Sequence, residues 1–103
     1  MIKVSVLYPN SDGVRFDMQY YLERHLPMCR EMLGAACRSI AVDHGVGGAM
    51  PGSPATYVVM AHMLFDSVAA YQAAFAPHVK AIIADLPNYT DVKPVVQVSE
   101  VKQ

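Results

Sequence analysis

Apolar and polar residues alternate from Ile2 to Tyr8, in the period of two that predicts a half-buried β-strand. Three later segments have strand-like patterns as well: Arg38–His44, Thr56–Phe65 and Lys93–Val101. Residues 45–54, between the second and third of these strands, are too rich in glycine and proline for regular structure. The hydrophobic pattern therefore predicts four strands and one long irregular loop.

Two other stretches repeat apolar residues at helical spacing. The first follows Asp17, a good N-cap, and stops at Gly34; its stripe is Met18, Tyr21, Leu22, His25, Cys29, Met32 and Leu33. The second follows Asp66, which we expect to cap in the same way; its stripe is Val68, Tyr71, Phe75, Val79, Ile82 and Leu86. These patterns predict two amphipathic helices, each with a proline inside it.

The predicted elements follow one another as strand, helix, strand, strand, helix, strand. This order is the βαββαβ pattern of an α+β, ferredoxin-like fold with a four-stranded antiparallel sheet. Right-handed crossovers place both helices on the same face of the sheet. With 103 residues, we expect a single domain over residues 1–103.

The third predicted strand is apolar on both of its faces. One face carries Tyr57, Val59, Ala61, Met63 and Phe65, and the other carries Val58, Met60, His62 and Leu64. Leu7 and one of the pair Val95 and Val96 add to the second face, which the helices cannot cover. Because such a patch rarely faces water, we expect a homodimer that buries it, with His62 in the interface. The alternative is a monomer with an apolar sheet face.

Composition excludes several classes of protein. The formal net charge is −1 and the eight basic residues are scattered, which argues against nucleic-acid and membrane-surface partners. The apolar runs are too short to span a bilayer, and the alternating start is unlike a signal peptide. The two cysteines, Cys29 and Cys37, are expected to be free thiols in a reducing compartment. We therefore expect a cytoplasmic protein.

His25 is the strongest candidate for chemistry. It lies on the inward stripe of the first helix, two residues before Pro27, which should disturb the helix around Glu23. Imidazole titrates near neutral pH, so a half-buried histidine can serve as a general acid or base. Equally, His25 can be a core histidine that bonds the freed Glu23 carbonyl or a nearby tyrosine.

A pocket between the helices and the sheet should surround His25. We expect Tyr8, Tyr21, Tyr57 and Phe75 to bind a small hydrophobic ligand there, with His78 at its flank, although these aromatic residues can also simply fill a core. Cys29 can pair with His25 one helical turn away, but a core cysteine is usually inert. No metal-binding spacing and no phosphate or dinucleotide fingerprint occurs, so we expect neither a metal nor a cofactor.

The sequence resembles a known family along almost its whole length. Residues Phe16–Met28 read FDMQYYLERHLPM and resemble the FDxxYYxxxHxPL segment of EthD-like proteins, with Met28 in place of the more usual leucine. Three other segments are similar to the family as well: Ile2–Pro9, the strand from Tyr57 to Phe65, and Ala84–Thr90. The resemblance implies the dimeric α+β barrel superfamily, in which two sheets face each other across a dimer.

The resemblance also bears on activity. In methylmuconolactone isomerases of the wider superfamily, a histidine matching His25 is assigned to proton transfer. EthD-like proteins are named for a role beside oxygenases that degrade ethers, and many carry the label reductase, but no nicotinamide or flavin fingerprint supports reduction here.

Two functional hypotheses follow. The first is a cofactor-free enzyme in which His25 moves a proton on a small aromatic or lactone-like catabolite, in an isomerisation or a dehydration. The second is a non-catalytic binding or accessory protein for an oxygenase pathway. The sequence does not choose between them.

Overall fold

A single antiparallel sheet with strand order β2-β3-β1-β4 forms the base of the computed structural model, which describes all 103 residues. Its strands are β1 (Ile2–Pro9), β2 (Ser39–His44), β3 (Tyr57–Phe65) and β4 (Val95–Glu100). All four lie where the alternating patterns predict them, and the ends differ by at most two residues. The irregular stretch predicted for residues 45–54 is the loop that joins β2 to β3.

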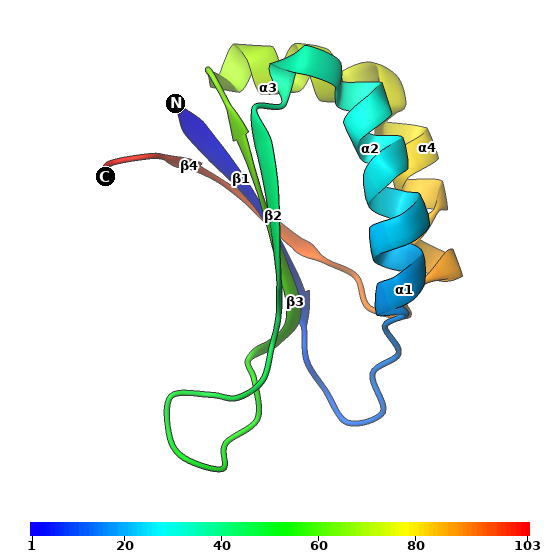
Figure 1. Ribbon diagram of the computed structural model, residues 1–103, viewed down its shortest axis with the longest axis vertical. Helices are drawn as coiled ribbons and strands as arrows, with labels where there is room; N and C mark the ends of the chain where they lie inside the picture. Colours follow the sequence, from blue (N-terminus) through cyan, green and yellow to red (C-terminus); the bar gives the residue numbers. More distant parts are fainter.

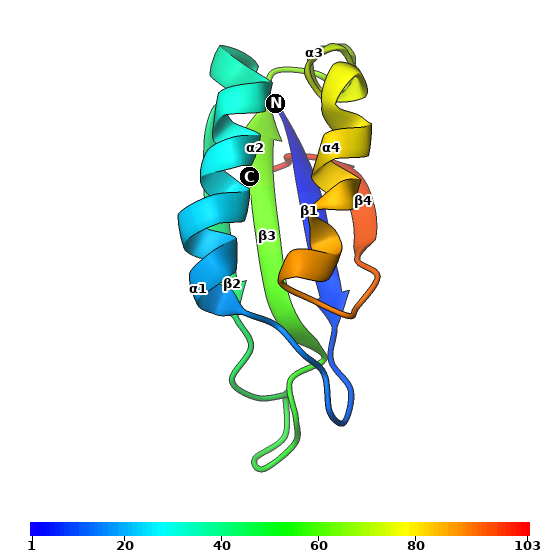
Figure 2. The ribbon, with the colours of Figure 1, turned by 90° about the vertical axis from the view of Figure 1, so that its right-hand side faces the viewer.

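Both helical stretches pack on one face of this sheet (Figures 1 and 2). Their segments are α1 (Met18–Tyr20), η1 (Tyr21–His25), α2 (Leu26–Leu33), η2 (Gly34–Ala36), α3 (Val68–Phe75), η3 (Ala76–His78), α4 (Val79–Ala84) and η4 (Leu86–Asn88). Figure 1 shows every helix on the same side of the sheet, and the opposite face without cover. The βαββαβ, ferredoxin-like α+β fold is therefore confirmed.

The two helical stretches begin differently from each other. The Asp17 carboxylate accepts a hydrogen bond from the backbone N–H of Tyr20 at 3.0 Å, so Asp17 is the predicted N-cap. The prediction that Asp66 caps the second stretch is wrong, because Ser67 accepts the bond from the Ala70 N–H at 3.0 Å. Asp66 instead forms an exposed ion pair with Arg38 at 2.7 Å.

Pro27 is accommodated by a π-helical turn. The turn is η1, and the N–H of Leu26 bonds to the carbonyl of Tyr21 across five residues. This places Pro27 at the second position of α2, directly after the π-helical turn. The extra residue in the turn shifts the inward stripe, so that Leu26 is buried and the predicted Leu22 is 49% exposed.

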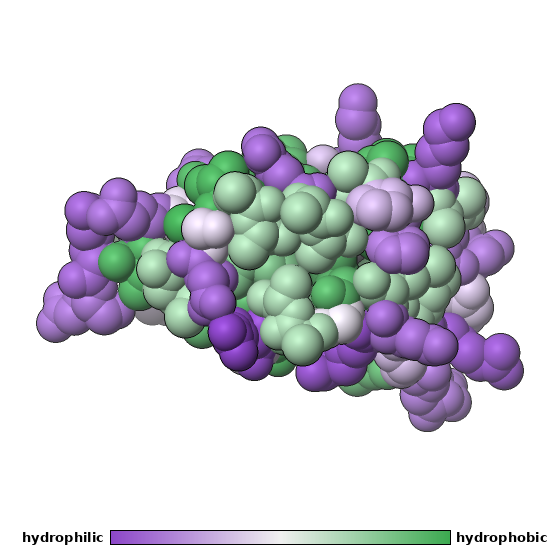
Figure 3. Space-filling view, turned by 90° about the horizontal axis from the view of Figure 1, so that it is seen from above, coloured by the Kyte–Doolittle hydropathy of each residue, from purple (hydrophilic) through white to green (hydrophobic).

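Pro77 divides the second stretch into α3 and α4, joined by the 3₁₀ turn η3. Val68, expected on the inward stripe, is 43% exposed at the start of α3. Figure 3 shows this end of the molecule from above, with hydrophobic side chains across its middle and polar ones around them. The stripe turns inward from Tyr71 onward, where the helical segment lies over the sheet.

The core is thin, with only 13 of 103 residues buried. It consists of two apolar clusters beneath the helices. One gathers Tyr8, Tyr21, Leu26, Val59, Ala61 and Tyr89, and the other gathers Ile2, Val4, Cys29, Leu33 and Phe65. A core of this size leaves room for a cavity between the helices and the sheet.

The uncovered face of the sheet mixes apolar and polar side chains. Leu7 lies opposite Met60 of β3 and Val95 of β4, and these three residues form an apolar patch toward one end of this open face. Beside them, the Ser5 hydroxyl and His62 Nδ1 are hydrogen-bonded at 2.8 Å. The register therefore assigns Val95, and not Val96, to the open face. No helix in the structure is long and apolar enough to cross a membrane.

Candidate functional site

A cavity of about 590 Å³ lies between the helices and the covered face of the sheet. Twenty-one residues line it, and 18 of them are hydrophobic. They come from strands β1, β2, β3 and β4, from both helical stretches and from the segment that precedes β4. This volume is typical of sites that bind small organic molecules.

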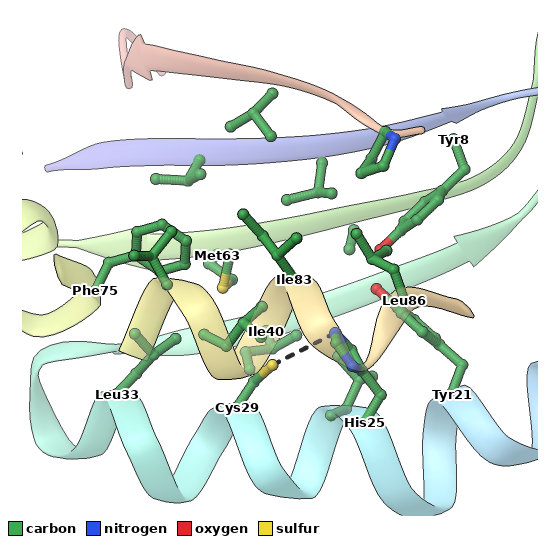
Figure 4. A pocket seen from close by; sticks show the side chains of 18 of the residues that line it. Tyr8, Tyr21, His25, Cys29, Leu33, Ile40, Met63, Phe75, Ile83 and Leu86 are labelled. Atoms are coloured by element: carbon green, nitrogen blue, oxygen red, sulfur yellow. Dashed lines mark hydrogen bonds between the residues drawn. The ribbon is translucent and has the colours of Figure 1, made fainter. Parts of the chain in front are cut away.

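His25 is the last residue of the π-helical turn and points toward the cavity between Tyr21 and Cys29 (Figure 4). Only 4% of the residue is exposed to solvent. Its Nδ1 atom lies 2.9 Å from Oδ2 of Asp85, in the short segment between α4 and η4. The ring also stacks on Tyr21, with centroids 5.4 Å apart, so both its position and its plane are fixed.

Asp85 is held by three hydrogen-bond donors. The Tyr20 hydroxyl donates to Oδ1 at 2.7 Å, the Asn88 side-chain amide donates to the same atom at 2.9 Å, and His25 contacts Oδ2. Burial by itself raises the pKa of the carboxyl group, but the bonds from Tyr20, Asn88 and His25 outweigh it and lower the pKa below its usual 3.8. Asp85 is therefore ionised at neutral pH.

The state of Asp85 decides which nitrogen of His25 carries the proton. An ionised carboxylate only accepts, so Nδ1 must be the protonated nitrogen of the neutral ring. Burial lowers the pKa of His25 below 6.5, and this effect exceeds the opposing influence of Asp85. At neutral pH the ring is uncharged, and Nε2 is unprotonated and can accept a hydrogen bond or a proton.

Two buried groups approach Nε2. The Tyr89 hydroxyl lies 3.3 Å away and the Cys29 sulfur 3.5 Å away. The Tyr89 hydroxyl also bonds to the hydroxyl of Tyr8 at 2.9 Å. Asp85, His25, Tyr89 and Tyr8 thus form a continuous hydrogen-bonded chain that ends at the cavity.

The groups around His25 remain protonated at neutral pH. Burial is the main cause that raises the pKa of Tyr8, Tyr21 and Tyr89 above the usual 10. Burial likewise raises the pKa of Cys29 to about 11, so its sulfur is a thiol and a poor nucleophile. The tyrosine hydroxyls are therefore hydrogen-bond donors, and His25 is the one base directed into the cavity.

The structure brings together most of the predicted site residues. Tyr8, Tyr21 and Phe75 line the cavity with His25, and Figure 4 shows the hydroxyls of Tyr8 and Tyr21 pointing toward one another. Tyr57 and His78 do not line it, so the expectation of their position was wrong.

Both misplacements have a local cause. Tyr57 lies at the start of β3, where the register with β1 shifts between Tyr8 and Pro9, and it faces a shallow hollow beside the long loop. His78 ends the 3₁₀ turn at Pro77, whose tighter winding rotates it away from the stripe that Phe75 and Val79 continue.

Sequence reasoning missed Asp85 and Tyr89 as site residues. They lie beyond the second helical stretch, and Asp85 is sixty residues from His25. The backbone bond from Asp17 N–H to the Tyr89 carbonyl, 2.7 Å long, ties their segment to the start of the first helix. The sequence marks this segment as a helix break at Pro87 and Asn88 and as part of Ala84–Thr90, which resembles EthD-like proteins, but neither signal assigns a role to Asp85 or Tyr89. No group of three or more histidine, cysteine or acidic side chains is arranged to hold a metal ion.

Comparison with known proteins places this arrangement in a family. The EthD domain family matches residues 15–93, which include His25, Asp85 and Tyr89. The chain belongs to the EthD family. Among curated proteins, none is found to match this EthD chain.

Solved structures agree with the family and the fold. An EthD-like protein from Ralstonia eutropha JMP134 is 43% identical, with a TM-score of 0.92 over 96% of this chain and 89% of that one. An ethyl tert-butyl ether D family protein from Bacillus halodurans C-125 is 21% identical, with a TM-score of 0.74 over 99% of both chains. A protein from Bacteroides fragilis NCTC 9343, described as dimeric, of unknown function and ferredoxin-like, has 19% identity and a TM-score of 0.58 over 97% and 95%. The last two share the fold.

Proposed function

We propose that this EthD protein is a cofactor-free acid–base enzyme that isomerises or dehydrates a small aromatic or lactone-like molecule. The observation that carries the proposal is the buried His25, whose Nδ1 is bound to Asp85 at 2.9 Å while Nε2 is directed toward an apolar cavity. A neutral imidazole whose second nitrogen is unprotonated can accept a proton and return it.

The reaction needs only groups that the chain supplies. His25 Nε2 removes a proton from a carbon next to a carbonyl of the substrate, and the electron pair moves onto the carbonyl oxygen. Asp85 stabilises the imidazolium that forms, as the carboxylate of an Asp–His pair does. His25 then returns the proton to a different carbon in an isomerisation, or to a departing hydroxyl group, which leaves as water, in a dehydration.

The tyrosines supply the matching acid side of the site. The hydroxyls of Tyr21 and Tyr8 point toward one another at the cavity (Figure 4), and the Tyr8 hydroxyl also bonds to that of Tyr89 at 2.9 Å. Donors that face a dry cavity stabilise a developing oxyanion more strongly than they do in water. Because the proton of Tyr8 is directed to Tyr89 when Tyr89 donates to His25, Tyr21 is the hydroxyl positioned to donate to a carbonyl oxygen of the substrate.

The protein we propose is a homodimer, in which a second copy of the chain covers the open face of the sheet. The open face of the sheet, which includes the apolar patch of Leu7, Met60 and Val95, has no cover from its own helices, and Val95 is 52% exposed. Face-to-face pairing of two such sheets buries these residues in both copies. The description of the Bacteroides fragilis protein as dimeric supports this arrangement.

A purely binding role is the second candidate. It is favoured by the lining of the cavity, in which 18 of 21 residues are hydrophobic and few polar groups are aimed at a ligand. In this role the protein holds a small molecule for an oxygenase and performs no chemistry on it.

One experiment separates the two roles. A panel of lactones and cyclic enones is incubated with the protein in D2O, and NMR follows both deuterium uptake at carbon and shifts in the protein spectrum. Catalysis predicts protein-dependent deuterium uptake or isomerisation that His25→Gln abolishes while the fold and binding persist. Saturable binding without any exchange, in the wild type as in His25→Gln, supports the binding role and contradicts the enzyme.

A further inference from the structure

The mouth of the cavity carries a cation. Three of the 21 lining residues are exposed to solvent, namely Ile83, Lys93 and Val96, so the opening lies between α4 and the start of β4. Two of these are apolar, with Ile83 56% and Val96 52% exposed. Lys93 is therefore the one charged group at an otherwise apolar entrance.

Lys93 has no ionic partner within the chain. The three ion pairs of the structure join His25 to Asp85, Arg38 to Asp66, and Lys102 to Glu100. Asp91, the nearest carboxylate in sequence, accepts a hydrogen bond from the Arg15 backbone N–H at 3.0 Å. No aspartate or glutamate lines the cavity, so nothing in the lining offsets the charge of Lys93.

The polar groups of the cavity are thus divided between its two ends. The base His25 and the tyrosine hydroxyls lie at the buried end, where 4% of His25 is exposed, and Lys93 lies at the open end. Between them the walls are hydrophobic. A ligand that satisfies both ends has an apolar ring system that enters first and an anionic group that stays at the entrance, where it keeps part of its hydration.

We propose that the ligand of this cavity is an amphipathic organic anion, with its carboxylate or similar acidic group bound by Lys93 at the mouth. This inference names the substrate class of the site described under Proposed function and rests on that function for the role of the ligand, but not for its binding. Binding in this way also fixes the orientation of the ligand in the cavity, because its anionic end cannot enter the apolar interior without losing its solvation.

Two dyes with the same aromatic body test the charge requirement. 8-Anilinonaphthalene-1-sulfonate carries a sulfonate, and N-phenyl-1-naphthylamine is its neutral counterpart. Fluorescence titration of each dye is compared in the wild type, Lys93→Met and Lys93→Glu. Lys80→Met is the matched control. Lys80, on α4, is exposed like Lys93 but does not line the cavity.

Binding of the sulfonate dye should weaken about two- to fivefold in Lys93→Met, the range of a solvent-exposed ion pair, and about tenfold in Lys93→Glu. The neutral dye should change less than about twofold, and Lys80→Met should match the wild type with both dyes. Added salt should reduce the difference between the wild type and Lys93→Met in their affinity for the sulfonate dye. Equal loss of both dyes on Lys93→Met, or no loss of the sulfonate dye, overturns the proposal while leaving the proposed chemistry of His25 intact. Failure of the wild type to bind the sulfonate dye also overturns the proposed ligand class, whereas the proposed chemistry of His25 is tested separately by the deuterium-exchange experiment.

Discussion

Nδ1 of His25 lies 2.9 Å from Oδ2 of Asp85, although sixty residues of chain separate the two. The contact joins the π-helical turn before Pro27 to the segment between α4 and η4. Because the ionised Asp85 can only accept, the contact fixes the tautomer of His25 and leaves Nε2 as the unprotonated nitrogen. The chemistry proposed for the cavity depends on this pair.

The burial of His25 should make the stability of the fold depend on pH. Its pKa is below 6.5 in the folded chain, so between that lowered pKa and 6.5 the unfolded chain binds more protons than the folded one. The free energy of unfolding should therefore fall as the pH drops from 7 through 6.5 toward 5. Urea denaturation at a series of pH values measures this, and His25→Gln should show a shallower decline.

His44→Gln is the control for that series. His44 is exposed at the end of β2, so the variant should follow the wild type across the same pH range. A decline in His25→Gln as steep as in the wild type contradicts the neutral, buried state of His25. The lowered pKa of Asp85 acts in the same direction but only near and below pH 3.8, outside this window.

Removal of the Tyr89 hydroxyl should destabilise the fold. Tyr89→Phe leaves the buried hydroxyl of Tyr8 without the bond it makes at 2.9 Å, and the loss of a partner from a buried polar group costs about 1–3 kcal/mol. Tyr8→Phe should cost a similar amount, and the double variant should lose less than the sum of the two. Urea denaturation measures all three. If the losses in the free energy of unfolding of the two single variants add up to that of the double variant, the hydroxyls are not coupled. Tyr71→Phe is the control, because it breaks no bond to Tyr8 or Tyr89.

The open face of the sheet should set the oligomeric state. We expect the wild type to sediment at twice the 11.3 kDa mass of the chain, and Met60→Lys to sediment as a monomer. Met60 lies between Leu7 and Asp43, and Asp43 can compensate the new charge, so the monomer should remain folded. Val46→Lys, at a loop position that is 99% exposed, should stay dimeric. A wild type that remains monomeric at high micromolar concentration contradicts the proposed pairing.

Most of the fold was predictable because it follows from local patterns. Alternation located the four strands, and the cap at Asp17 and the stop at Gly34 bounded the first helical stretch. The failures are equally local. Asp66 and Ser67 are both good N-caps, and in the structure Ser67 caps the helix while Asp66 pairs with Arg38. A π turn is not visible in a 3.6-residue period, so Leu22 was assigned the place that Leu26 takes.

The candidate site was only half predictable. His25, Tyr8, Tyr21 and Phe75 belong to strands and helices whose inward faces can be read from spacing, and all four line the cavity. Asp85 and Tyr89 belong to an irregular segment, and they reach His25 through tertiary contacts such as the isolated bridge between Phe16 and Thr90. The spacing of apolar residues along the sequence does not reveal such a tertiary contact.

The protonation state of His25 is the most direct test of the proposed site. Long-range ¹H–¹⁵N NMR spectra distinguish the two neutral tautomers from the charged ring. At pH 7 we expect His25 to be neutral with its proton on Nδ1, and to gain a second proton only below pH 6.5. Asp85→Asn should remove the tautomer preference and lower the pKa further, because Asp85 favours the charged form. A ring protonated on Nε2, or charged at pH 7, contradicts a free base directed into the cavity.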